Sequence, residues 1–218
     1  MLAFLNDWIS LHLLIWLLPV AFFLHDGEEI VTVERWVRPR KHTLSPLMQR
    51  ALNWDKSITV QFATAVVLIG SLICLGTGMA AAAVEDGGKL GPVFLGMVAV
   101  MLLDGIKHVG LSLGKRSYTV GAVTAALVEI PYASYALYRF YQADLVEPAA
   151  LWLGIAIVLP LVFFLIGIGF TLGRWIAPFR RPAAGSGQTD TGSPHLGSIS
   201  AHQGADLAER KGQRTDGY

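Results

Sequence analysis

Five long apolar runs constrain this chain more than any other feature of its sequence. They cover about residues 8–30, 58–82, 91–113, 118–141 and 149–172. A helix that rises about 1.5 Å per residue needs about 20 predominantly apolar residues to cross a bilayer. Each run has this length, so we predict an all-α, polytopic membrane helical bundle of about five transmembrane helices.

The composition agrees with a membrane protein and disfavours other classes. Charged residues make up 15% of the chain, whereas a soluble domain carries about 25%. The net charge of +1 provides no basic field for a nucleic acid. The single cysteine, Cys74, excludes a disulfide framework within the chain. We therefore expect the lipid bilayer as a partner and no nucleic acid.

Basic residues between the runs predict the orientation of the helices. Eleven lysines and arginines lie on one predicted side, and two, Lys89 and Arg139, lie on the other. Cytoplasmic loops carry the excess of basic residues, so we expect the N-terminus outside and the C-terminus in the cytoplasm. The first residues lack the basic start of a secretion signal, so we expect the first run to be retained. Together these features favour a bacterial inner membrane.

The composition changes abruptly after Arg181. Residues 1–181 contain the apolar runs and form the predicted transmembrane domain. Residues 182–218 are rich in glycine, serine, threonine and alanine, with almost no large apolar groups. Such a segment buries too little surface to offset the entropy of ordering it. We therefore predict a disordered cytoplasmic tail over residues 182–218.

Ionisable residues interrupt the first apolar run near its predicted cytoplasmic end. His25, Glu28 and Glu29 stand at positions i, i+3 and i+4, so a helix places all three on one face. Imidazole and carboxylate groups on adjacent turns suit a divalent metal such as zinc, iron or manganese. The same spacing suits a general base held by a histidine, and both interpretations stay open.

The third and fourth runs carry a second set of ionisable residues. Asp104 and His108 are four residues apart and share a helix face, with Lys107 between them. Glu129 lies in the fourth run, shortly before Pro131. A charge inside a bilayer costs at least about 2.5–3.5 kcal/mol on insertion scales. Several such residues together therefore indicate ion pairing, a bound metal or a water-filled cavity.

The two sets share one predicted depth in the membrane. Counting back from Lys115 at about 1.5 Å per residue places His108 roughly 10 Å, and Asp104 roughly 16 Å, above the inner boundary. The same count from Arg35 places His25 roughly 15 Å above it. We therefore expect the first and third helices to turn these faces toward each other in the cytoplasmic half of the bilayer.

Three short stretches carry a resemblance to a known family. They are LHDGEE at residues 24–29, DGIKH at 104–108 and RSYTVG at 116–121. The chain resembles the HXXEE-motif membrane proteins, which are small integral proteins of unknown function, over about residues 15–140. The resemblance implies a family identity and not a reaction.

Single positions follow the family pattern unevenly. His108 matches a histidine of the family, whereas Asp104 stands where an asparagine or histidine is expected. Tyr118 and Gly121 match a Tyr-x-Pro-Gly step that opens the next helix. Val120 replaces the proline of this step, so we expect a less rigid turn. Two further positions fit the pattern, Thr124 and Pro131.

The leading hypothesis is a metal-dependent membrane enzyme that acts on a lipid or another membrane-soluble substrate. The predicted metal ligands are His25, Glu28, Glu29, Asp104 and His108. Glu129 and Lys107 are the candidates for proton transfer. A metal-bound hydroxide could hydrolyse a substrate, and an iron ion with an open coordination position could oxidise one. Both interpretations, a hydrolase and an oxidoreductase, therefore stay open.

Two rival interpretations of the same residues stay open. In a transporter, the carboxylates and histidines would carry protons or metal ions across the membrane. The restriction of the cluster to the inner half of the bilayer disfavours this interpretation. In a scaffold or regulator, the cluster would only hold three helices in register.

Overall fold

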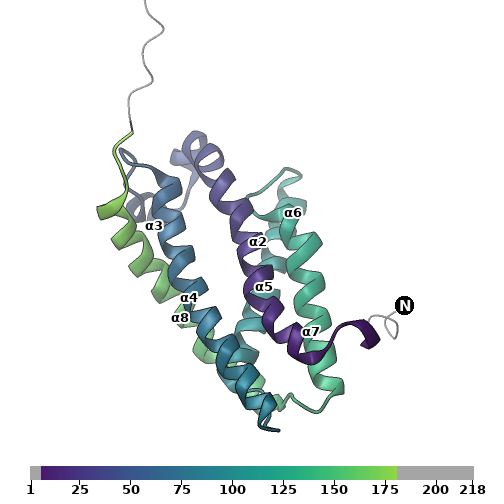
Figure 1. Ribbon diagram of the computed structural model, residues 1–218. Coiled ribbons are helices and arrows are strands. Elements are labelled where there is room, and N and C mark those ends of the chain that lie inside the picture. The colour runs from purple at the N-terminus through teal and green to yellow at the C-terminus, as the bar shows by residue number, and fades with distance from the viewer. Residues whose placement is uncertain (1–5, 181–218) are drawn as a thin grey trace, which may run out of the picture. The chain divides into compact units, whose positions relative to one another are not determined.

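The computed structural model describes residues 6–180, and its regular elements in this range are helices (Figure 1). The long helices are α2 (Leu11–Val37), α4 (Ile58–Glu85), α5 (Pro92–Lys115), α7 (Ile130–Gln142) and α8 (Pro148–Ile176). The short elements are η1 (Arg38–Thr43), α3 (Pro46–Ala51), α6 (Ala122–Thr124) and the π-helical turn η2 (Ala125–Glu129). The all-α prediction is confirmed.

Within the described residues, three helices are long and apolar enough to cross a membrane, namely α4, α5 and α8. Helix α2 is also long, but charged side chains occupy its second half. The predicted fourth span is divided into α6, η2 and α7. The apolar helices support a membrane protein, whereas the number of spans and their orientation stay predictions. The predicted tail over residues 182–218 lies outside the described residues.

Helix α8 contacts α5 near one end and α4 near the other, through glycines in both places. A Cβ atom on Gly154 would overlap the backbone of Pro92 and Gly96 in α5. A Cβ atom on Gly169 would overlap Ala65 in α4. Small residues allow such close approach between membrane helices. Figure 1 shows α4 and α8 side by side, with α2 between them and α7. The C-terminal part of α2 contacts the start of α4, where the N–H and the hydroxyl of Thr59 donate to Oε2 of Glu34.

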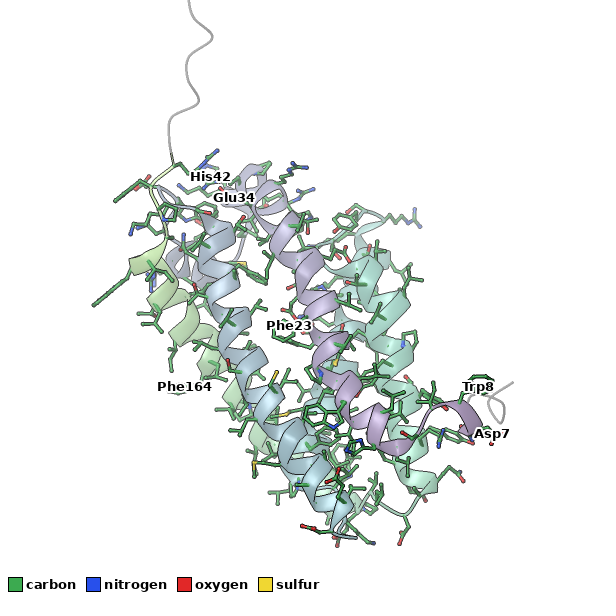
Figure 2. All side chains as sticks on the ribbon, viewed as in Figure 1. Asp7, Trp8, Phe23, Glu34, His42 and Phe164 are labelled. Carbon is green, nitrogen blue, oxygen red and sulfur yellow. The ribbon has the colours of Figure 1, made fainter. Side chains whose placement is uncertain are left out.

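A tightly packed apolar core joins α2, α4, α5, α7 and α8. Among its most buried members, each at most 3% exposed, are Leu14, Ile15, Leu18, Phe94, Leu95, Val98 and Phe140. Phe23 bridges α2 and α4 farther along, where a Cβ atom on Gly70 would overlap its ring (Figure 2). Along α2 and α5 the ionisable residues follow this core, from His25 on α2 and from Asp104 on α5.

We expect the substitution Gly154→Val to lower the melting temperature of the detergent-solubilised protein markedly. The added side chain would have to displace the backbone of α5, and overpacking of this kind costs about 1–3 kcal/mol or more. Gly167→Val is the matched control on α8, because no atom lies within 4 Å of a Cβ placed there. Thermal unfolding followed by tryptophan fluorescence measures both variants. Equal melting temperatures for the two would contradict the close α5–α8 contact.

Candidate metal centre

His25 lies in the middle of α2 and is only 3% exposed. Its Nδ1 is 3.1 Å from Oγ1 of Thr124, and that hydroxyl donates its proton to Oε2 of Glu28 at 2.7 Å. The hydroxyl oxygen is therefore left to accept a hydrogen bond from Nδ1–H of His25. The proton on Nδ1 leaves a lone pair on Nε2, and Nε2 has no hydrogen-bond partner among the described residues. Metal-binding histidines are held in this way through their other ring nitrogen.

His108 on α5 is likewise held through Nδ1, but its Nε2 has close partners. Its Nδ1 is 2.7 Å from the carbonyl oxygen of Val120, which can only accept, so Nδ1 donates. Its Nε2 lies 3.0 Å from Oδ2 of Asp104 and 3.1 Å from Oε1 of Glu29. One nitrogen of the ring is thus fixed by the backbone, and the other points at two carboxylates.

The two histidines and Asp104 bring their ligand atoms to one place. One nitrogen or oxygen atom from each of the three residues lies within 4.8 Å of the others. The imidazole centroids of His25 and His108 are 5.1 Å apart, and Nε2 of His25 is 3.7 Å from Oδ2 of Asp104. The first and third predicted helices, α2 and α5, therefore bring their histidine and acidic residues together as predicted. A divalent metal fits two imidazole nitrogens and a carboxylate oxygen at such spacing.

Four carboxylates surround this place and line one cavity with Lys107. They belong to Asp26, Glu29, Asp104 and Glu129. Lys107 donates a hydrogen bond from Nζ to Oδ1 of Asp104. Among the described residues that line the cavity, Lys107 is the one lysine or arginine. Uncompensated negative charge is costly among apolar helices. A divalent cation, or protons on the histidines and carboxylates, would offset this excess.

Glu129 reaches the cavity from the π-helical turn η2 and is 2% exposed. Its Oε2 is 3.5 Å from Nδ1 of His25 and has no hydrogen-bond partner among the described residues. The π turn arises because the N–H of Ile130 donates to the carbonyl of Ala125, five residues earlier. Turns of this kind are frequent at functional sites. Gly105 leaves room for Glu129, since a Cβ atom there would lie 3.0 Å from Oε2.

Glu28 faces a different set of partners from its neighbour Glu29. Its carboxylate accepts from the Tyr118 hydroxyl at 2.6 Å, from the Thr124 N–H at 2.8 Å and from the Thr124 hydroxyl. The structure therefore does not bring Glu28 to the ligand atoms of the two histidines. Instead, Glu28 orients His25 through Thr124.

Sequence reasoning gave no role to Asp26 and did not find the contacts of Gly121. Asp26 lines the cavity, and the signal for it was its place directly after His25 in the motif. Gly121 has a φ of +80°, and a Cβ atom there would lie 2.7 Å from Oε1 of Glu29 and 2.8 Å from Cε1 of His25. The signal for Gly121 in the sequence was the Tyr118-x-x-Gly121 step. The turn requires glycine there because glycine adopts a positive φ without strain.

Comparison with known proteins gives one match. The family model described as "Protein of unknown function with HXXEE motif" matches residues 16–136, a range that contains every residue of the candidate centre. No curated protein and no solved structure matches the chain.

Proposed function

We propose that this chain, which belongs to the HXXEE family of proteins of unknown function, is a metal-dependent membrane enzyme. One observation carries the proposal. The buried Nε2 of His25 has no hydrogen-bond partner among the described residues, and ligand atoms of His25, His108 and Asp104 lie within 4.8 Å of one another. A cluster that only held helices in register would be expected to satisfy its buried polar atoms. An unsatisfied lone pair that faces a carboxylate and a second imidazole instead supports a cation as the missing partner.

In this proposal the metal ligands are His25, His108 and Asp104, with Glu29 as a fourth. Two nitrogen and two oxygen donors suit zinc, iron or manganese. The metal would supply Lewis acidity or an activated water to a membrane-soluble substrate. Glu129, which borders His25 with a free carboxylate oxygen, and Lys107, which lines the same cavity, are proposed to transfer protons.

The packing of the bundle favours an enzyme over a transporter. A transport path would need polar lining through both halves of the membrane. Beyond the cluster, however, Leu18, Val98 and Phe140 are fully or almost fully buried in the apolar core. The excess of basic residues lies at the end of the helices that is nearer the cluster, which supports a bacterial inner membrane with this centre in its cytoplasmic half.

The test is the metal content of the full-length protein, purified in mild detergent without chelators and with a tag that lacks histidine. Inductively coupled plasma mass spectrometry should find about one equivalent of zinc, iron or manganese per chain. His12→Ala is the control, because Nε2 of His12 pairs with Glu85 at 2.8 Å, away from the candidate centre, and the variant should keep its metal. Less than roughly a tenth of an equivalent, after incubation with each of the three metals, would overturn the proposal.

A further inference from the structure

The cavity beside the candidate metal centre extends along apolar helix faces. It has a volume of about 320 Å³, within the range of small-molecule sites. Its ionisable lining comes from α2, α5 and η2. The facing wall, built by α4 and α8, is apolar and includes Phe62, Val66, Ile69, Val162, Ile166 and Phe170. One side of the cavity is therefore chemically reactive, and the other suits hydrocarbon.

The apolar wall is elongated along the helix axes. On α4 it runs from Phe62 to Ile73, which spans roughly 16 Å at the helical rise. On α8 it runs from Val158 to Phe170, which spans roughly 18 Å by the same measure. A wall of this length without an ionisable group fits an extended hydrocarbon chain better than a compact polar molecule.

The charge of the centre decides which end group such a chain can carry. Four acidic residues line the cavity against one lysine, so acidic groups outnumber this basic group at the polar end. A substrate with a carboxylate or phosphate at this end would place a further acidic group among them in a poorly solvated place. An uncharged oxygen function meets no such repulsion.

We infer that the cavity binds an uncharged, single-chain lipid, such as a long-chain alcohol, aldehyde or ester, with its oxygen end at the metal centre and its chain along α4 and α8. This inference rests on the proposed function, which supplies the metal at the polar end. The cavity walls supply the rest: the space lies between the ionisable groups of α2, α5 and η2 and the apolar side chains of α4 and α8.

Photolabelling of the full-length protein in phospholipid nanodiscs tests this inference. The probes are hexadecanol and hexadecanoic acid that carry a diazirine at the same carbon of the chain, and mass spectrometry locates the labelled residues. We expect the alcohol to label the cavity residues of α4 and α8 about tenfold more than the acid, and excess unlabelled hexadecanol to compete. Equal or stronger labelling by the acid would overturn the inference.

Variants of the apolar wall sharpen the test. Val162→Trp and, independently, Ile69→Trp should fill the cavity and reduce labelling by at least about fivefold. Phe164→Trp is the matched control two residues from Val162, because Phe164 is 63% exposed on the outer side of α8 (Figure 2), and it should label as the wild type does. Labelling that is unchanged in both cavity variants would overturn the inference.

The metal content of the same samples separates this inference from the proposed function. The wall variants should keep their metal, because neither Val162 nor Ile69 contributes a ligand atom. Bound metal without labelling of the cavity would refute the lipid inference and leave the metal centre in place. Labelling of the cavity in a protein that takes up no metal would refute the proposed enzyme and leave the binding of the lipid chain.

Discussion

Replacing His25 by alanine should remove the bound metal from the purified protein, and replacing His108 should do the same. Each substitution deletes one of the two imidazole nitrogens that converge on Asp104. Loss of a residue that only supports a metal ligand already costs about 10–100-fold in affinity, so loss of a ligand itself should cost more than about 100-fold. Metal content and competition with a chelator of known affinity measure the effect.

A control separates loss of metal from loss of fold. His42 lies on η1 outside the centre, and His42→Ala should bind metal as tightly as the wild type does. The melting temperature of each metal-free variant should stay close to that of metal-free wild type. If His25→Ala and His108→Ala lower the melting temperature of the metal-free protein but keep one equivalent of metal, the cluster holds the helices together and is not a metal centre.

Thr124→Val should weaken metal binding by about 10–100-fold, although Thr124 is not a proposed ligand. The hydroxyl accepts from Nδ1 of His25 and donates to Glu28, so it sets both the tautomer and the orientation of the imidazole. Valine has nearly the same shape but leaves Nδ1 without its acceptor. The ring is then free to rotate or to place its proton on Nε2, which blocks coordination.

Two further variants identify the hydroxyl as the cause. Thr124→Ser keeps the hydroxyl and should restore tight binding, which a role in packing the threonine methyl group would not. Tyr118→Phe removes a different partner of Glu28, the phenol at 2.6 Å, and should have a smaller effect because the link to His25 stays intact. Wild-type affinity in Thr124→Val would show that this hydrogen-bonded link does not position His25.

Much of the fold follows from the sequence because the length of an apolar run is a local property. The run over residues 58–82 became α4 (Ile58–Glu85), and the run over 149–172 became α8 (Pro148–Ile176). The run over 118–141 did not become one helix. Gly121 adopts a positive φ, and the hydrogen bonding shifts by one residue in η2. A pattern of apolar residues carries no sign of either change.

The candidate centre was predictable only as far as helix periodicity reaches. Spacing placed His25 with Glu29 on one face and Asp104 with His108 on another, and counting along the helices placed both faces at one depth. Both features depend on the rise and turn of a single helix. The structure brings these residues together as expected.

Tertiary structure alone decided which of two adjacent glutamates turns toward the histidines. Glu28 and Glu29 share the helix face of His25 almost equally, so spacing does not separate them. Glu28 accepts hydrogen bonds from Tyr118 and Thr124, about 90 residues farther along the chain, whereas Glu29 pairs with His108. The sequence by itself determined apolar helices and a polar face on each, because these depend on neighbouring residues. The partners of each side chain were decided by packing between distant segments, because a hydrogen bond depends on position in space.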